Sequence, residues 1–599
     1  MIPSHLKTLL LFVGVFLFQT SLFSDNNFSN KISLLSTKQE WHNILHFRDG
    51  ESEIDDERFF LAKEGKQNPQ AELQASIEKL ISDKSDDENS TFCYYPSRST
   101  WILEKIPELK KEIKIPQCIA LQKEKKVLGA KYVTLVLASA HINSPASAFG
   151  HTFLRIDNNP HTPLLSYAVN YAAQTTETNG FIYAYQGLFG GYKGKYSIEP
   201  YYKKLKEYSD LEQRDIWEYR LNLTPEEIER MLNHIFEIRH FYADYLFMAE
   251  NCSYNLLWLI EVAKPNSHLI EQFNHKAIPI DTIRAILSEN LVKSTIYRAS
   301  KRKNILALSR PIENNSVALA FAQSDDYNLS SIKNLSKKEK IAALSLATEL
   351  LKIKRSHNKI SNKDYLAHFL RILKERSKLG KITKEKQIKA SAPQEGHLST
   401  KTSFSYLNNQ TLSLRTKVAY HDIYDNENGY ISGAYINFLD TAIAYKDNKL
   451  KLKELNILEI KSYAIQDSIF KPISWEVALG AKRIFNNELN SYVTAGAGMT
   501  LGSNELFGYA TLTPTLYYRQ QTQESIATNI GLLYNPSSHL KFGLLGKNEW
   551  FSKNREIKEI EPFFTYSFSQ KAALNFNYKY KDIDGIEEKE SSLSLFWYF

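Results

Sequence analysis

The spacing of apolar residues along the chain changes near residue 396. Before this point, apolar side chains recur at helical spacing in several segments, as at Leu73, Ile77 and Leu80. After it, apolar and polar residues alternate, as in TLSLRTKVAY (411–420). Helical spacing predicts an amphipathic helix, whereas strict alternation predicts a strand with one apolar face. The pattern therefore separates a mixed N-terminal part from an all-strand C-terminal third.

The C-terminal strands have the composition of a transmembrane barrel. Roughly twelve alternating segments are joined by short turns, and Tyr, Phe and Trp are frequent among their apolar residues. A bilayer offers the backbone no hydrogen-bond partners, so strands cross it only as a closed barrel. We therefore expect an antiparallel outer-membrane β-barrel over residues 396–599. A soluble sandwich or barrel with a buried apolar face is the alternative.

The N-terminal part combines strands with helices. Strands are predicted at three apolar, β-branched segments, YVTLVLASA (132–140), HTFLRI (151–156) and LLSYAVNYA (164–172). A helix is expected to start at Pro225 with Thr224 as its N-cap, and a second helix is expected to begin near Asn251. These elements predict an α+β domain over residues 131–275.

Further segments surround these two domains. Residues 25–130 and 276–395 carry mostly helical patterns, and the second of them is basic and ends in a linker. The stretch QGLFGGYKGKY (186–196) is rich in glycine and aromatic residues, which indicates a flexible loop. Residues 1–24 are predicted to be a secretory signal peptide, because Lys7 precedes an apolar run too short to span a membrane. The chain is therefore expected to be exported.

Charge and composition narrow the range of partners. The 75 basic and 67 acidic residues give a net charge of +8, which is a mild excess for 599 residues. That balance fits proximity to anionic lipid headgroups and gives no reason to expect nucleic acid. No His, Cys and Asp cluster occurs at metal-ligand spacing, so neither a metal nor another cofactor is expected.

The three cysteines divide into a pair and a single residue. Cys93 and Cys118 flank one short segment, and a disulfide between them is expected in an oxidising compartment. Cys252 is then the remaining thiol. It is either a buried, inert cysteine or a functional nucleophile.

Cys252 and His151 could together form a nucleophilic pair. Cys252 opens a predicted helix in AENCSYNLLWLIE (249–261), and His151 opens a predicted strand in SPASAFGHTFLRI (144–156). A helix N-terminus lowers the pKa of a thiol, and a neighbouring imidazole completes its activation. The backbone amides at the start of the same helix could hold an oxyanion. Sequence spacing alone does not show that the two residues meet.

Several stretches of the N-terminal part are typical of one family: FFLAKEGKQNPQAEL (59–73), CYYPSRSTWI (93–102) with Cys118 after it, SYAVNYAA (166–173) and the blocks around His151 and Cys252. Together they resemble the Lnb N-terminal periplasmic domain family. The order of histidine first and cysteine later is also similar to circularly permuted papain-like hydrolases. These include lecithin–retinol acyltransferase relatives and permuted NlpC-type enzymes. The resemblance spans about residues 40 to 265 and implies a permuted papain-like domain.

The resemblance implies a cysteine-dependent acyl transfer in the periplasm. Family members look like lipoprotein N-acyltransferases, which would move an acyl chain from phospholipid onto the cysteine and then onto the N-terminal amine of a lipoprotein. Carried over to this chain, the resemblance makes Cys252 the nucleophile and His151 the general base and acid. Asn170 is the candidate for orienting the imidazole, and Tyr167 is the alternative. His141 is a second candidate base.

Other assignments stay open at this point. Arg155, Tyr183 and Tyr185 could line a substrate pocket or face outward. The family's acyltransferases look anchored by inner-membrane helices, whereas this chain has a predicted outer-membrane barrel, so the acyl acceptor is in doubt. Phospholipid and lipoprotein remain the expected partners. The alternatives are a peptidoglycan amidase or peptidase using the same Cys–His pair, and a barrel transporter with a non-catalytic periplasmic domain.

Overall fold

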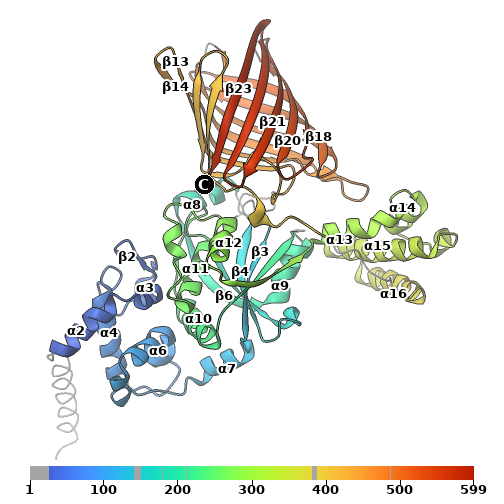
Figure 1. Ribbon diagram of the computed structural model, residues 1–599. Helices are drawn as coiled ribbons and strands as arrows, with labels where there is room; N and C mark the ends of the chain where they lie inside the picture. The colour runs from blue at the N-terminus through green and yellow to red at the C-terminus, as the bar shows by residue number, and fades with distance from the viewer. Residues whose placement is uncertain are drawn as a thin grey trace, which may run out of the picture. The chain divides into compact units, whose positions relative to one another are not determined.

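The computed structural model separates the chain into two compact units (Figure 1). The described residues are 26–139, 150–177, 180–211, 214–380, 388–485, 488–552 and 554–599. The predicted signal peptide therefore lies outside them. Of the described residues, those within 26–138, 150–208 and 216–298 form the first unit, and those within 299–599, together with residues 139, 209–211, 214 and 215, belong to the second. No helix within the described residues is long and apolar enough to cross a membrane.

The first unit begins with the expected helices. These are α2 (Asn26–Ser36), α3 (Gln39–Leu45), α4 (Pro69–Ser82), α5 (Thr91–Tyr94), α6 (Pro96–Lys105) and α7 (Ile119–Leu128). In α4, the Asn68 side chain caps the N-terminus by accepting a hydrogen bond from the Ala71 backbone N–H. Leu73 and Ile77 on the predicted apolar face are fully buried. The helical spacing of this segment therefore marks a face that packs into a core.

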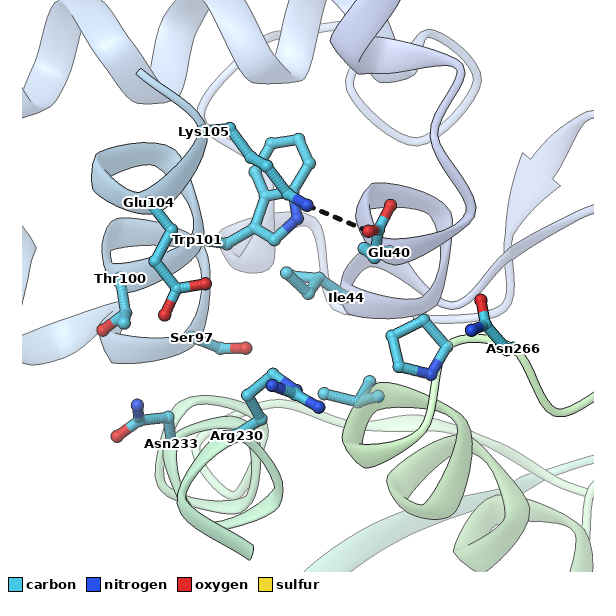
Figure 2. A pocket seen from close by; sticks show the side chains of 12 residues that line it. Glu40, Ile44, Ser97, Thr100, Trp101, Glu104, Lys105, Arg230, Asn233 and Asn266 are labelled. Carbon is cyan, nitrogen blue, oxygen red and sulfur yellow. Dashed lines mark hydrogen bonds and ion pairs between the residues drawn. The ribbon is translucent and has the colours of Figure 1, made fainter. Parts of the chain in front are cut away.

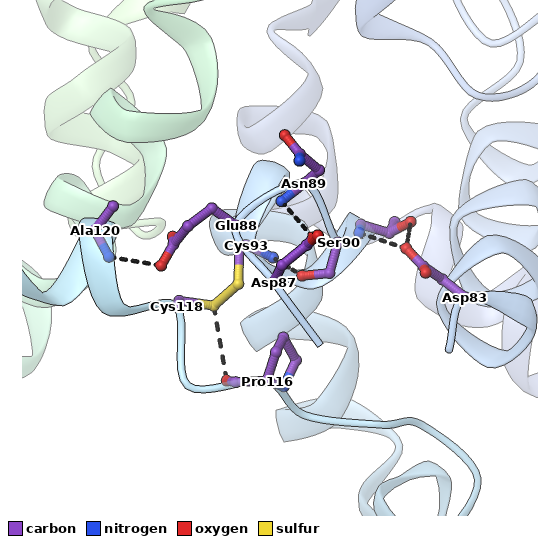
Figure 3. The surroundings of a disulfide bond; sticks show 10 residues. Asp83, Asp87, Glu88, Asn89, Ser90, Cys93, Pro116, Cys118 and Ala120 are labelled. Carbon is purple, nitrogen blue, oxygen red and sulfur yellow. Dashed lines mark hydrogen bonds between the residues drawn. A yellow bond between two sulfur atoms is a disulfide. The ribbon is translucent and has the colours of Figure 1, made fainter. Parts of the chain in front are cut away.

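A disulfide joins Cys93 to Cys118, as the cysteine count predicts (Figure 3). The two Cα atoms are 5.4 Å apart. Cys93 lies in α5, and Cys118 immediately precedes α7. The Glu88 carboxylate also accepts a hydrogen bond from the Ala120 backbone N–H at 2.6 Å. The bond therefore fastens the start of α7 to the segment around α5, and it leaves Cys252 as the free thiol.

A seven-stranded antiparallel sheet forms the centre of the first unit. Its order is β8-β6-β5-β4-β3-β7-β9. The bounds are β3 (Tyr132–Ala138), β4 (His151–Asp157), β5 (Tyr167–Gln174), β6 (Tyr192–Pro200), β7 (Ile216–Leu221), β8 (Ala243–Tyr245) and β9 (Val292–Arg298). The three strands predicted from apolar segments are β3, β4 and β5, and they lie next to one another. The α+β class expected for this part is therefore confirmed.

Three helices lie between β7 and β9 in the chain: α10 (Pro225–Ile238), α11 (Cys252–Ala263) and α12 (Pro279–Ser288), with β8 between α10 and α11. Thr224 and Glu227 form a capping box at the start of α10, as the Thr–Pro sequence predicts. Helix α11 is buried along its whole length and packs against β4 and β5, with α10 beside it. This packing places Cys252, the first residue of α11, next to the sheet.

Two segments differ from the sequence expectation. The stretch 186–196 is not a loop: it contains the end of α8 (Gly180–Phe189) and the start of β6. The two glycines between them, Gly190 and Gly191, have positive φ and make the turn. The expected helical connector contains a strand, β9, which pairs with β7 at the sheet edge. The compact first unit accordingly extends to residue 298.

The second unit includes a helical group in the region where the sequence predicts the rest of the connector. Its helices are α13 (Lys301–Ser309), α14 (Ser316–Gln323), α15 (Lys337–Ser356) and α16 (Asn362–Lys378). They enclose an apolar core, and Ile469 and Phe470 of the barrel pack against it. An ion pair of 2.7 Å between Arg302 and Asp467 joins the same two regions.

The C-terminal third is a closed barrel of twelve long antiparallel strands, with β11–β13 pairing closing the circle. The strands are β10 (Lys401–Leu407), β11 (Leu412–Lys417), β13 (Ala434–Lys446), β14 (Lys449–Ser462), β16 (Ser474–Arg483), β17 (Leu489–Gly502), β18 (Leu506–Tyr518), β19 (Thr522–Tyr534), β20 (Leu540–Phe551), β21 (Arg555–Ser569), β22 (Ala572–Ile583) and β23 (Ile586–Tyr598). The short β12 (Ala419–His421) and β15 (Ile465–Gln466) pair with β13 and β17.

The barrel places apolar side chains outside and polar side chains inside. Exposed and buried residues alternate along β18, for example. Ile530, Leu544 and Leu595 are about half exposed on the outside, whereas Lys541 and Glu549 are buried inside. A soluble barrel would show the reverse polarity, so the outer surface is built to face lipid. The predicted transmembrane barrel is therefore confirmed, and the soluble alternative is not supported.

The barrel interior is filled largely by charged side chains. A polar cavity of about 310 Å³ remains, and the residues around it include Arg415, Lys417, Asp440, Glu454, Lys547 and Glu561. Residues 422–427 fold into the interior: the Tyr424 hydroxyl donates to Glu561, and the Asn426 amide donates to the backbone oxygens of Ser537 and Leu540. This packing gives little support to an open solute channel through the described part of the barrel.

Candidate active site

Cys252 is the first residue of α11 and is buried. The preceding Asn251 is the N-cap, and its side-chain oxygen accepts hydrogen bonds from the backbone N–H groups of Ser253 at 3.0 Å and Tyr254 at 3.3 Å. Asparagine caps a helix well, and the exposed backbone dipoles at a helix N-terminus favour a negative charge. The Asn-Cys sequence therefore fixes the thiol at the helix end where a thiolate is stabilised.

His151 is the first residue of β4, and Asn170 lies on the neighbouring strand β5. His151 Nε2 and Asn170 Oδ1 are 2.7 Å apart. An amide oxygen can only accept, so Nε2 carries the hydrogen and donates a hydrogen bond to Asn170. The other ring nitrogen, Nδ1, is then the basic one. The structure thus brings together Asn170 and His151 in the relation expected from the sequence.

The imidazole of His151 also hydrogen-bonds to the Cys252 thiol. Burial alone raises the pKa of this thiol, but the charge and hydrogen bond of His151 and the backbone N–H of Thr152 outweigh it. The pKa of Cys252 falls to about 7. The thiol therefore ionises at a lower pH than an ordinary cysteine. All three predicted site residues therefore meet at one place.

Fewer backbone N–H groups at the start of α11 can bind an oxyanion than the sequence analysis expects. Two of them, from Ser253 and Tyr254, are used by the Asn251 cap. The Cys252 N–H donates to the Tyr245 hydroxyl over 3.3 Å, which is long for such a bond. The Cys252 N–H is therefore the best-placed backbone donor for an oxyanion, with Tyr245 beside it. Tyr245 comes from β8, and no sequence pattern near it marked it in advance.

Glu250, two residues before the nucleophile, has an unusual environment. Burial raises the pKa of its carboxyl group, and the negative charges of Glu53, Asp55 and Asp244 raise it further, to about 8. Glu53 is itself held by α11, because it accepts hydrogen bonds from the Tyr254 hydroxyl at 2.7 Å and from Trp258 Nε1 at 2.8 Å. Glu250 adjoins the Asn-Cys sequence, a position that sequence reasoning passed over.

The remaining sequence candidates fall elsewhere. Arg155 does not line a pocket: it is buried in ion pairs of 2.8 Å with Asp157 and Glu218 in the sheet. Tyr167 of β5 is paired with Ile156 of β4, at the end of β4 away from His151. Tyr185 is 65% exposed on α8. His141 and the side chain of Tyr183 lie outside the described part of the chain.

A separate pocket of about 210 Å³, lined by both polar and apolar side chains, lies at the opposite end of α11 (Figure 2). Its lining includes Trp101 of α6, Arg230 of α10 and Val262 of α11, and a 3.0 Å ion pair between Lys105 and Glu40 crosses one side of it. Arg230 donates two hydrogen bonds, from Nε and Nη2, to the Ala263 carbonyl oxygen. Cys252 and Val262 are separated by most of the helix, so this pocket does not serve the thiol.

Comparisons with known families assign three parts of the chain. Residues 122–289 match the family model described as the Lnb N-terminal periplasmic domain. Residues 33–105 match one domain of unknown function (DUF7843), and residues 390–598 match another (DUF7840). No curated protein matches the chain.

Among solved structures, the similarity lies in the barrel. The NanC porin is 10% identical over 34% of this chain and 100% of its own, with a TM-score of 0.25. An outer membrane channel from Pseudomonas putida F1 is 11% identical over 36% of this chain and 100% of its own, with a TM-score of 0.23. The outer membrane channel DcaP of Acinetobacter baumannii is 8% identical over 35% and 100%, with a TM-score of 0.19.

Location follows from the matched domain together with the barrel's own construction. The barrel presents apolar side chains to its surroundings and closes all its edges, as a bilayer requires. The protein is therefore placed in the bacterial outer membrane, with the other domain in the periplasm. The chain thus joins a domain that matches the Lnb N-terminal periplasmic domain model over residues 122–289 to a C-terminal twelve-stranded outer-membrane β-barrel.

Proposed function

We propose that this protein is a periplasmic cysteine acyltransferase anchored in the outer membrane. It would move an acyl chain from phospholipid to an amine, such as the N-terminus of a lipoprotein, through a thioester on Cys252. The observation that carries the proposal is the arrangement of Cys252, His151 and Asn170. The thiol has a pKa of about 7 beside His151, and Asn170 binds the far nitrogen of the imidazole at 2.7 Å.

The chemistry follows from the proton positions. The Cys252 thiolate attacks the ester carbonyl of a phospholipid, a C–S bond forms, and the C–O bond to the glycerol oxygen breaks. The His151 imidazolium gives its Nδ1 proton to that leaving oxygen, which departs as a lysophospholipid. An incoming amine then attacks the thioester and loses a proton to His151, and the thiolate leaves. One imidazole therefore serves as acid and then as base.

Asn170 would act through His151 as a positioning residue. By accepting a hydrogen bond from Nε2, with 2.7 Å between nitrogen and oxygen, it fixes both the tautomer and the tilt of the ring. A neutral amide orients the ring without adding a negative charge that would stabilise the imidazolium. The histidine can then release its proton readily in the first half of the reaction.

Helix α8 favours a lipid substrate. Its Ile182, Tyr185 and Phe189 side chains are 44%, 65% and 73% exposed. The helix is tied to the segment before the nucleophile, because the Phe247 backbone N–H donates to the Gly187 carbonyl at 2.7 Å. A peptidoglycan substrate would be better served by a polar surface, since sugars and peptides need hydrogen-bond partners. The exposed apolar helix therefore supports the acyl-transfer hypothesis over the peptidoglycan one.

Intact mass spectrometry tests the proposal. The full-length protein in detergent is incubated with phosphatidylethanolamine vesicles, beside the Cys252→Ser variant as the matched control. We expect the wild type alone to gain the mass of one acyl chain and to lose it on treatment with hydroxylamine, which cleaves thioesters. A folded wild-type protein without this adduct would contradict the proposal, and cleavage of muropeptides by the same sample would favour the peptidase alternative.

A further inference from the structure

A second histidine cluster lies in the unit that contains the barrel. His397 precedes β10, His421 ends β12, and Asp425 follows four residues later. One ligand atom from each of the three residues lies within 4.8 Å of the others. His421 and Asp425 are buried, with 1% and 2% of their surfaces exposed. His421 and Asp425 are close in sequence, but His397 lies 24 residues before His421, so no local motif contains all three residues.

The two imidazoles meet nitrogen to nitrogen. His397 Nε2 and His421 Nδ1 are 2.9 Å apart, whereas the ring centroids are 5.2 Å apart with the planes inclined by 26°. The short nitrogen distance beside the long centroid distance shows that the rings approach edge to edge. The lone pairs or protons of these two nitrogens therefore point at each other.

In each ring, the nitrogen that faces the other histidine is the inner nitrogen, and the nitrogen that faces away is the outer one. Both outer nitrogens have oxygen partners. His397 Nδ1 is 2.8 Å from the Leu398 carbonyl oxygen, and His421 Nε2 is 3.3 Å from Glu427 Oε2. Both oxygens are acceptors, so each of these nitrogens bonds best when it carries the proton. A neutral imidazole has one N–H, which leaves a lone pair on each inner nitrogen. Two lone pairs facing each other at 2.9 Å repel unless a cation lies between them or beside them.

Asp425 supplies a third candidate metal ligand, and hydrogen bonds fix the orientation of its carboxylate. Its Oδ2 is 3.6 Å from His397 Nε2 and accepts a hydrogen bond from the Asp422 backbone N–H at 2.9 Å. Its other oxygen, Oδ1, accepts from Lys401 Nζ at 2.6 Å and from the Tyr598 hydroxyl at 2.7 Å. The carboxylate is therefore clamped with one oxygen turned toward the histidine pair. Metal-binding histidines are typically oriented by the same means, through hydrogen bonds from the outer nitrogen to a carbonyl or carboxylate.

We propose that His397, His421 and Asp425 bind one divalent transition-metal ion, with zinc the best fit. Two imidazole nitrogens and one carboxylate oxygen are a common zinc donor set, with a fourth position left for water. Nitrogens bound to one tetrahedral zinc ion lie about 3.4 Å apart, so the rings need to separate by only about half an ångström. Tyr430 stacks on both rings, at 4.3 and 4.5 Å, and shields the site.

The charged side chains around the site determine how tightly a metal ion is expected to bind there. Asp422, Asp425 and Glu427 are already paired with Lys401, Lys417 and Lys541. An incoming dication therefore meets no excess of negative charge, and we expect binding weaker than at an all-thiolate site. Its effect would be structural: it would fasten the chain entering the barrel at His397 to the segment 421–427 that folds into the interior. The close approach of Gly396 and Gly429, where a Cβ on Gly429 would lie 2.5 Å from the Gly396 nitrogen, brings these two segments together.

Zinc titration of the full-length protein tests this proposal. All samples carry Cys252→Ser, so that the thiol and His151 cannot hold zinc, and all are stripped with a chelator before isothermal titration. We expect the parent to bind one more equivalent of Zn²⁺ than the variants His397→Ala and His421→Ala. His539→Ala is the matched control, because His539 is exposed and its ring nitrogen contacts only the Ser567 carbonyl among the contacts described for it. This variant should bind like the parent.

A folding check separates loss of the site from loss of the barrel. Folded outer-membrane barrels migrate differently from boiled ones in electrophoresis, and each variant is scored this way. If either alanine variant does not fold, Glu427→Gln replaces it in the test. This variant keeps the shape of the side chain but removes the charge that orients His421 and pairs with Lys541, and it should weaken zinc binding about 10- to 100-fold. Equal zinc binding by the parent and by folded variants would overturn the proposal and leave a shared proton as the occupant between the rings.

Discussion

The two histidine sites of this protein use the same side chain for different chemistry. At the Cys252 site, the outer nitrogen of His151 donates to a neutral amide and the inner one meets a thiol that can give up a proton. In the barrel, the outer nitrogens of His397 and His421 have oxygen partners and the inner ones meet each other. An imidazole facing a proton donor suits proton transfer, whereas two imidazoles facing each other suit a cation.

At both sites the partner of the outer nitrogen decides what the inner nitrogen can do. At the Cys252 site that partner is Asn170 on the next strand, whereas in the barrel Glu427 lies six residues after His421 in the same segment. The substitutions that follow change one member of each site at a time.

The largest effect is expected from His151→Ala. Removing the imidazole takes away both the proton acceptor and the group that lowers the pKa of Cys252, so acyl-enzyme formation should slow by about 10²- to 10⁴-fold. The rate is measured by quenched-flow mass spectrometry of the thioester. The barrel histidines provide the control: His397→Ala should leave this rate unchanged. A His151→Ala enzyme with the wild-type rate would show that the Cys–His pair is not the reacting pair.

Asn170→Ala and Glu427→Gln form a matched pair of intermediate effects. Asn170→Ala frees the His151 ring to rotate, and a misplacement of this kind costs up to about 100-fold in acyl-enzyme formation. Glu427→Gln should leave that rate unchanged but weaken zinc binding by about 10- to 100-fold. Each variant is therefore expected to change the measurement made at its own site, either acyl-enzyme formation or zinc binding, and to leave the other measurement unchanged. If Asn170→Ala changes neither the rate nor the pH at which the thiol ionises, then Asn170 serves only the packing of β5.

The smallest effect concerns Glu250 and the pH dependence of stability. Its pKa of about 8 lies far above the value near 4.3 of an unfolded glutamate. Between these two values the folded protein holds a proton that the unfolded chain has released, so this group makes stability fall as pH rises from about 4 to about 8. Glu250→Gln should therefore gain thermal stability over the wild type across this range and keep the gain above pH 8.

Melting curves of both proteins from pH 4 to pH 9 check the sign. Glu64→Gln, at an exposed position before α4, is the control and should follow the wild type. Parallel curves for Glu250→Gln and the wild type would mean that the Glu250 carboxyl titrates normally and is not an unusual group beside the thiol.

Much of the fold and of the Cys252 site could be predicted from the sequence because the signals were local. The strict alternation after residue 396 predicts the barrel, and the apolar strand segments predict β3, β4 and β5. The Asn-Cys start of an apolar helix marks Cys252, and the order of strands places Asn170 beside His151. Each of these depends on neighbours in the chain or on adjacent strands, which periodicity and capping rules describe well.

The features that the sequence did not reveal depend on distant segments. Strand β9 has a mixed, exposed pattern because it lies at a sheet edge, so it gives no apolar signal. Arg155 occupies a strand position that could face a pocket, and only the approach of Glu218 from β7 shows that it is a buried ion pair. His397 and His421 meet because residues 422–427 fold into the barrel, which no local pattern predicts.

The ionisation of Cys252 is the most direct test of the proposed chemistry. Cys252 is the free thiol of a chain whose other two cysteines are bonded, so alkylation by iodoacetamide reports on it alone. We predict that the alkylation rate of the wild type rises with a midpoint near pH 7, and that His151→Ala moves the midpoint up to about 8.5 or higher. A wild-type midpoint already near 8.5, unchanged by His151→Ala, would contradict the claim that His151 activates this thiol.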